Sequence, residues 1–120
     1  MKMRKTILLI EDEEELLSIL TTILAKAGYE VLPRSGWKDT VLDPAALRDL
    51  NLLVNYLLGE HGLHICKKIK SSENTRHIPV IILSASPGSN EEVSAAQADE
   101  FVEKPFDINL LLNMIGGYLA

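Results

Sequence analysis

The chain has 120 residues, with 12 lysines and arginines against 17 aspartates and glutamates, so its formal net charge is −5. This length fits one domain, and we expect residues 1–120 to form it. The acidic balance without a basic stripe argues against nucleic acid as a direct partner. No apolar run approaches the roughly 20 residues that span a bilayer, and the single cysteine suits a reducing compartment. We therefore expect a cytoplasmic protein without membrane contact.

Short apolar runs alternate with amphipathic segments along the chain. Residues 5–10 contain a continuous apolar run at 7–10, typical of a strand buried on both faces, and residues 12–27 carry leucine and isoleucine at helical spacing before Gly28. The remaining strands are expected at 29–32, 50–54, 79–83 and 101–103, and the remaining helices at 63–70, 91–98 and 108–119. A proline interrupts the helical pattern within 34–49 and predicts a short or irregular element there. This alternation predicts an α/β fold with a parallel sheet covered on both faces.

The helix expected at 63–70 has two unlike faces. Its apolar face carries Cys66, which we expect to be a small core residue. The other face carries three lysines that we expect to be solvated: Lys67, Lys68 and Lys70.

Polar residues follow three of the predicted strands, at the edge where open parallel sheets bind ligands. Glu11 and Asp12 follow the first strand and offer the oxygen ligands that Mg²⁺ prefers. Asp12 could also be the N-cap of the next helix, with Glu15 completing a capping box, and the two roles are compatible. Ser84 follows the fourth strand and Lys104 the fifth. A hydroxyl and an ammonium group at these positions could contact a phosphoryl group, although each residue alone is commonplace at a strand end.

In this order and spacing, these groups resemble the receiver domain of two-component response regulators. The similarity extends over nearly the whole chain, and the fragments that carry it lie at residues 7–13, 59–70, 77–85 and 99–107. The resemblance implies a single flavodoxin-like (βα)5 three-layer sandwich with parallel strand order 2-1-3-4-5.

The resemblance also implies the roles of the strand-end residues. In such receivers an aspartate after the third strand takes a phosphoryl group from a sensor histidine kinase. The acidic pair, here Glu11 and Asp12, holds Mg²⁺, and the hydroxyl and lysine, here Ser84 and Lys104, contact the aspartyl phosphate. Phe101 holds the place of the aromatic residue whose rotamer changes as the switch.

Partners are implied in the same way: a sensor histidine kinase or a downstream effector protein. Family members use the surface of the fourth helix, fifth strand and fifth helix, here residues 90–118, which could also form a homodimer. The apolar residues that could supply contacts there are Val93, Phe101, Ile108, Leu112 and Ile115.

The phosphoacceptor aspartate of the family pattern is missing. Counting back from Gly62 and forward from Asp49 without a gap both place Val54 at that position, and a one-residue gap would place Asn55 there. No aspartate or glutamate occurs between Asp49 and Glu60. An acyl phosphate requires a carboxylate nucleophile, which neither valine nor a carboxamide supplies.

The missing carboxylate also weakens the predicted metal site. At an effective dielectric constant of about 20, one charge at ~4 Å changes the interaction energy by roughly 4 kcal/mol before desolvation, so we expect weak Mg²⁺ binding. Lys104 loses its usual anionic partner and is expected to turn to Glu11 or Asp12. The sequence therefore predicts a non-enzymatic, degenerate receiver, or pseudo-receiver, that signals through protein contacts.

Two other functions compete with this interpretation. A conventional phosphorylated receiver would need either a phosphosite altered from its natural residue or a substitute acid, for which Asp49 and Glu60 are the nearest candidates. A remote alternative is a small flavodoxin-like binding protein. The five consecutive acids at 11–15 argue against it, because they would repel a bound phosphate.

Overall fold

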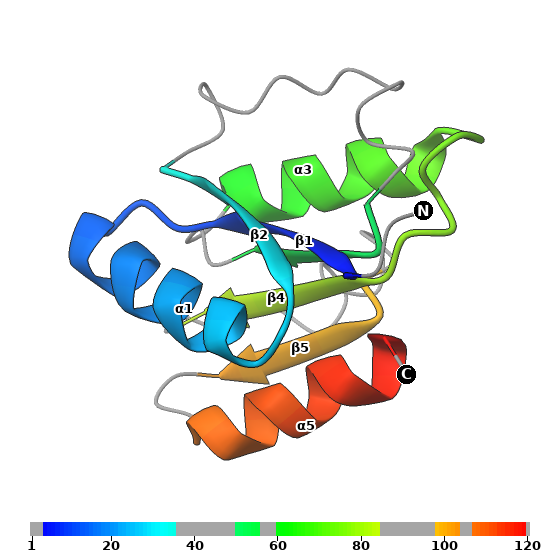
Figure 1. Cartoon of the computed structure of the whole chain (residues 1–120). Coiled ribbons are helices and arrows are strands. Elements are labelled where there is room, and N and C mark those ends of the chain that lie inside the picture. The colour runs from blue at the N-terminus through cyan, green and yellow to red at the C-terminus, as the bar shows by residue number, and fades with distance from the viewer. Residues whose placement is uncertain (1–3, 36–49, 56–59, 85–97, 104–106, 120) are drawn as a thin grey trace.

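The computed structural model describes residues 4–35, 50–55, 60–84, 98–103 and 107–119 (Figure 1). Its elements in chain order are β1 (Thr6–Ile10), α1 (Glu14–Lys26), β2 (Glu30–Arg34), β3 (Leu52–Asn55), α3 (Glu60–Ser71), β4 (Val80–Ser84), β5 (Glu100–Glu103) and α5 (Ile108–Leu119). The five strands form one parallel sheet in the order β2-β1-β3-β4-β5. This confirms the predicted flavodoxin-like α/β fold. The elements expected within 34–49 and 91–98 lie outside the described residues except at their ends.

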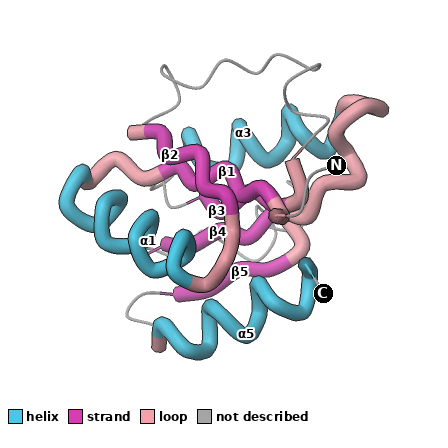
Figure 2. The backbone as a smooth tube through the Cα atoms, viewed as in Figure 1, coloured by secondary structure: helices cyan, strands magenta, loops and turns pink. Residues whose placement is uncertain are grey.

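The sheet is the middle layer of three (Figures 1 and 2). Successive residues of a strand point to opposite faces, so β1 contributes to two separate apolar clusters. Leu8 and Ile10 belong to the cluster beneath α3, whereas Ile7 and Leu9 belong to the cluster beneath α1 and α5. All five residues of β1 are buried, which explains why the four residues after Thr6 are apolar without alternation.

Most element boundaries differ from the sequence prediction by one to three residues, most notably those of β2, β3 and α3. β2 continues through Pro33 to Arg34 instead of ending before the proline. This is tolerated because β2 lies at the edge of the sheet and pairs only with β1, so the missing N–H of proline breaks no second ladder. β3 extends one residue further, to Asn55, and α3 begins earlier than predicted, at Glu60.

Gly28 ends α1 as its sequence position predicts. Ala27 is the C-cap residue, and Gly28 follows it with φ of +101°, a left-handed conformation that costs glycine little. The N–H of Gly28 donates to the carbonyl of Ala25 at 3.1 Å, which satisfies an acceptor at the end of the helix. The chain then turns directly into β2.

An ion pair joins α3 to the amino-terminal ends of β4 and β5. Lys70 Nζ lies 2.7 Å from Asp99 Oδ2, and the same carboxylate oxygen accepts a hydrogen bond from the N–H of Val80 at 2.7 Å. Lys70 also donates to the carbonyl of Ile78 at 2.9 Å. The prediction that Lys70 is solvated is therefore wrong, since its side chain is only 11% exposed, whereas Lys67 and Lys68 are exposed as expected.

Cys66 is fully buried in the cluster beneath α3, as predicted. Burial raises the pKa of the Cys66 thiol to about 11, although the positive charge of Lys70 partly opposes the shift. We expect a thiol-specific disulfide reagent at pH 8 to modify the folded protein at least ~100-fold more slowly than the urea-unfolded chain, because the reactive species is the thiolate.

The same pKa gives the sign of a stability change at high pH. The folded-state value lies above that of the unfolded chain, so the stability that Cys66 contributes is lost as pH rises from about 9 to 11. A Cys66→Ala variant should show a smaller loss over this range in urea denaturation. In the labelling experiment with the disulfide reagent, rapid modification of the folded protein at pH 8 would contradict the burial of the Cys66 thiol.

Candidate functional site

Glu11 is fixed at the carboxyl end of β1. Its N–H donates to the carbonyl of Arg34 at 3.0 Å, which prolongs the ladder between β1 and β2 by one step. Its side chain is buried, with the residue only 1% exposed, and Oε1 accepts a hydrogen bond from the N–H of Glu13 at 2.9 Å. Glu11 therefore links the end of the sheet to the start of α1.

The structure corrects the predicted cap of α1. The N-cap residue is Glu13 rather than Asp12, and Glu13 makes no side-chain capping hydrogen bond. The carboxylate of Glu11 instead accepts the backbone N–H at this junction. Asp12 is exposed, which is compatible with the metal-ligand role predicted for the pair. Negative charge at a helix N-terminus is favourable because it opposes the helix dipole.

Val54 occupies the apolar interior beneath α1 and α5. It is 1% exposed and lies opposite Leu9 in the parallel register of β1 and β3. Glu11 follows Leu9 by two residues and bonds to the start of α1, so strand alternation places both side chains on the same face of the sheet. Asn55 ends β3, with its backbone opposite Ile10 and Ile82.

The other predicted site residues are only partly covered by the structure. Ser84 ends β4, and its backbone lies opposite Glu103 of β5. Because all five strands are parallel, their carboxyl ends meet at one edge of the sheet, as expected. Phe101 is partly buried against the cluster beneath α3. Lys104 lies outside the described residues, and so does its expected contact with Glu11 or Asp12.

The predicted partner surface at 90–118 needs a correction. Ile115 is fully buried and cannot offer a contact, and Ile108 and Leu112 pack against the cluster beneath α1 and α5. Val93 lies outside the described residues. The large apolar side chains that α5 does expose are Leu110 and Tyr118. Helical phase relative to the buried Ile115 could have identified Leu110, five residues away, but not Tyr118, which is three residues away and so on nearly the same side.

Tyr118 connects α5 to β5. Its hydroxyl donates to Glu100 Oε1 at 3.0 Å. Partial burial, followed by this hydrogen bond, raises the pKa of Tyr118 to about 12. The phenol therefore stays protonated, and remains a donor to Glu100, throughout the physiological range.

The two predicted metal ligands, Glu11 and Asp12, lie between the end of β1 and the start of α1. Glu11 and Asp12 provide carboxylate oxygens, which suit Mg²⁺ with several retained waters. Within the described ranges, however, no group of three or more His, Cys, Asp or Glu side chains is placed to hold a metal ion. Likewise, no helix among the described residues is long and apolar enough to cross a membrane.

The fold and the residues at the carboxyl edge of the sheet define a class of protein. This class is a flavodoxin-like α/β domain with an acidic pair at the carboxyl end of its first strand. A family model described as the response regulator receiver domain matches residues 7–116. The chain belongs to this family, and it is a receiver domain of two-component signalling. This membership favours the receiver interpretation over the remote alternative of a flavodoxin-like binding protein.

Individual relatives agree with this assignment. The chain is 29% identical over 121 residues to the polar-differentiation response regulator DivK of Brucella ovis, covering 98% of each chain. Among solved structures, it is 25% identical to the signal receiver domain of a signal transduction histidine kinase from Syntrophus aciditrophicus, with a TM-score of 0.83 and coverage of 96% and 89%. The response regulator TrrA from Thermotoga maritima, solved in complex with Mg²⁺-BeF, shares the fold at 22% identity, a TM-score of 0.78 and coverage of 95% and 98%.

Proposed function

We propose that this chain is a degenerate receiver that transmits its signal by protein–protein contacts rather than by aspartyl phosphorylation. The observation that carries the proposal is the composition of β3, Leu-Leu-Val-Asn, within a stretch without any acid between Asp49 and Glu60. Receiver chemistry needs a carboxylate there, because only a carboxylate oxygen can attack phosphorus to give an acyl phosphate. The chain therefore has no catalytic nucleophile, and we propose no enzymatic activity for it.

Val54 is the residue we propose for the phosphoacceptor position. Two counts without a gap lead to it, and it shares a face of the sheet with Glu11. Asn55 would take the position only with a one-residue gap. A carboxyl group at position 54 would therefore lie on the same face of the sheet as Glu11. The hydrocarbon side chain of valine instead joins the apolar cluster.

The proposed cation site is weak for the same reason. Receiver domains bind Mg²⁺ at their phosphorylation site, as the Mg²⁺-BeF complex of TrrA illustrates. Here Glu11 and Asp12 would hold the ion without a third carboxylate, and Glu11 already accepts the N–H of Glu13. The proposed partners are a sensor histidine kinase or a downstream effector, and the proposed location is the cytoplasm.

A small phosphodonor tests this function directly. We expect the protein incubated with acetyl phosphate and Mg²⁺ to keep its original intact mass, because no side chain at the site can accept the phosphoryl group. A Val54→Asp variant should gain one phosphoryl group that hydroxylamine removes, as it removes acyl phosphates.

The controls separate the two candidate positions and the substitute acids. Val54→Asn should stay unmodified, because a carboxamide is not a nucleophile of this kind, and Asn55→Asp should gain less than Val54→Asp. A stable, hydroxylamine-sensitive adduct on the unaltered chain would overturn the proposal. Peptide mapping of that adduct to Asp49 or Glu60 would identify a conventional receiver with a substitute acid.

A further inference from the structure

The outer face of α1 is unusual for an exposed helix because its middle carries no charge. Residues 16–25 contain no lysine, arginine, aspartate or glutamate. The inner face packs on the sheet through Leu20 and Leu24. The outer face exposes Ile19, half of which is accessible to solvent, together with small side chains at Ser18, Thr22 and Ala25. Solvent-facing sides of helices normally carry charged residues, so this face has the character of a contact surface.

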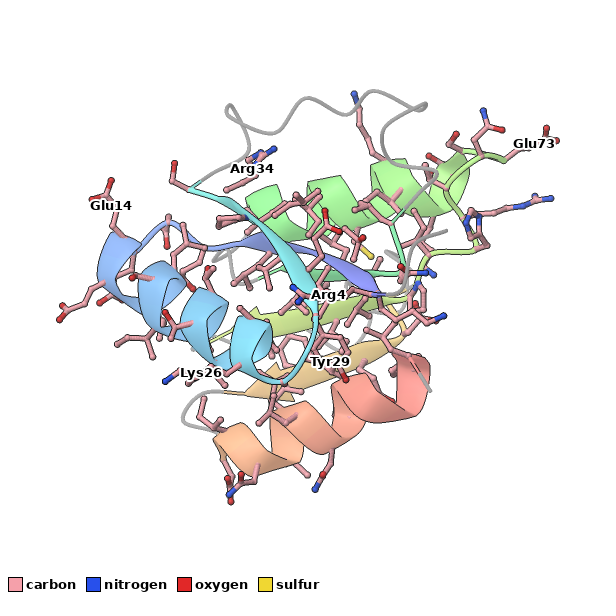
Figure 3. The ribbon with its side chains drawn as sticks, viewed as in Figure 1. Arg4, Glu14, Lys26, Tyr29, Arg34 and Glu73 are labelled. Carbon is pink, nitrogen blue, oxygen red and sulfur yellow. The ribbon has the colours of Figure 1, made fainter. Side chains whose placement is uncertain are left out.

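The charges of α1 lie only at its two ends. Glu14 and Glu15 are in the first turn and Lys26 is in the last. All three are exposed, and Figure 3 shows Glu14 and Lys26 extending from opposite ends of the helix. Neither Glu15 nor Lys26 forms an ion pair with another described residue.

The spacing of these residues makes the surface complementary to itself. Glu15, Ile19, Thr22 and Lys26 follow one another at intervals of four, three and four residues, so they form one stripe along the helix. The midpoint of the stripe lies between residues 20 and 21. Glu15 and Lys26 each lie about 8 Å from it along the helix axis, at 1.5 Å per residue.

A two-fold axis through this midpoint pairs the stripe with a second copy in the antiparallel direction. Such an axis would bring Glu15 against Lys26 of the partner subunit, and Lys26 against Glu15 of the partner subunit. Ile19 would meet Thr22 of the partner subunit near the axis. The contact is isologous, which is the commonest symmetry of protein dimers. The small side chains beside the stripe allow the two helices to approach closely.

We propose that this protein forms a homodimer through an antiparallel contact between the outer faces of two α1 helices. α5 covers the same face of the sheet and has no charged residue among its twelve, so α5 itself adds no charge that a contact beside α1 must desolvate (Figure 1). Within the alternative homodimer surface at residues 90–118, the described helix α5 lacks this charge pattern. α5 has no acidic residue in its first turn and no basic residue in its last, so charge gives a pair of α5 helices no preferred direction.

The dimer should be weak. One helix pair buries less area than the standard interface, which places the dissociation constant on the order of 10–100 µM. The proposal does not depend on whether the chain can be phosphorylated.

Charge reversal tests the direction of the helix pair. Sedimentation equilibrium of the full chain should show a monomer–dimer equilibrium. Glu15→Lys and Lys26→Glu should each weaken the dimer about tenfold, because each creates two like-charge contacts across the axis. The double variant Glu15→Lys/Lys26→Glu should return to within about threefold of the original affinity, because it restores both opposite-charge contacts.

Two controls keep a folding defect separate from a lost contact. Both reversals oppose the helix dipole, so thermal stability should fall furthest in the double variant even as its dimer recovers. Leu110→Asn removes an exposed apolar residue of α5 and should leave the dimer unchanged. A chain that stays monomeric to about 1 mM would overturn the proposal, because affinity weaker than this corresponds to less than about 4 kcal/mol. A dimer indifferent to the reversals, one not recovered in the double variant, or one lost with Leu110→Asn would overturn it equally.

Discussion

The Val54→Asp variant is expected to unfold with a free energy lower by about 3–5 kcal/mol at pH 7, because it places an unpaired charge in the apolar cluster beneath α1 and α5. Val54 is 1% exposed, and its neighbours in this cluster include Leu9 of β1 and Ile81 of β4. The substitution that should restore phosphoryl transfer is therefore also one that should destabilise the fold. Urea denaturation of the variant and the unaltered chain measures the difference.

The loss should depend on pH with a definite sign. Burial raises the pKa of a carboxyl group, so the introduced group has a higher pKa in the folded than in the unfolded state. The variant therefore retains the most stability below about pH 4, where the group is neutral in both states, and loses it as pH rises toward 7. Val54→Asn should lose stability without this pH dependence. A Val54→Asp variant as stable as the unaltered chain at pH 7 would contradict the burial of position 54.

Mg²⁺ should reverse part of the loss in this variant only. With the acid at position 54, Glu11 and Asp12 gain a third carboxylate on the same side of the sheet. Mg²⁺ at about 100 times its dissociation constant then returns about 2.7 kcal/mol. The unaltered chain, with two carboxylates, should show a much smaller shift in melting temperature at the same concentration.

The architecture could be predicted from the sequence because the hydrophobic pattern of each segment matches the way that segment packs in the fold. The apolar run of β1 has all five residues buried, and α5 has the bounds that its periodicity predicts, Ile108–Leu119. Gly28 ends α1 with the positive φ expected of a helix-ending glycine. Strand order followed from the resemblance to receivers, since periodicity alone does not specify which strands are neighbours.

The details of the site depend on contacts that the sequence does not show. Five consecutive acids stand at 11–15, and nothing local indicates that Glu11 is buried and accepts the N–H of Glu13 while Asp12 is exposed. Burial of one carboxylate among five is a property of the junction between β1 and α1. The prediction of Asp12 as N-cap was wrong because it considered only side chains within the helix segment.

Lys70, at the other end of the sheet, is a second residue whose contacts the local sequence does not predict. Its sequence neighbours Lys67 and Lys68 are exposed, so a local interpretation gives all three lysines the same role. Its partner Asp99 is distant in sequence, and the two meet only after β4 and β5 have paired. Sequence could identify the helix but not the ion pair that it forms.

Removing that ion pair should have the second-largest effect on stability. Asp99→Ala leaves the N–H of Val80 and the ammonium group of Lys70 without their shared acceptor, which should cost about 2–3 kcal/mol. Lys70→Met should cost only about 1 kcal/mol. It keeps most of the apolar side-chain packing, and the third-exposed Asp99 carboxylate still accepts the N–H of Val80 and reaches water.

A double-mutant cycle measured by urea denaturation tests this asymmetry. Once Lys70 is methionine, the Asp99→Ala substitution should cost less than it does alone, by about 1 kcal/mol, because the ammonium group is no longer left without its partner. Two results would show that the Asp99 carboxylate is not the shared acceptor. One is additive losses of unfolding free energy, and the other is a larger loss for Lys70→Met than for Asp99→Ala. The ion pair lies at the amino-terminal ends of β4 and β5, opposite the edge that carries Glu11 and Asp12. Both single variants should therefore lose stability without changing the response of the protein to Mg²⁺, which separates the support of the fold from the chemistry of the site.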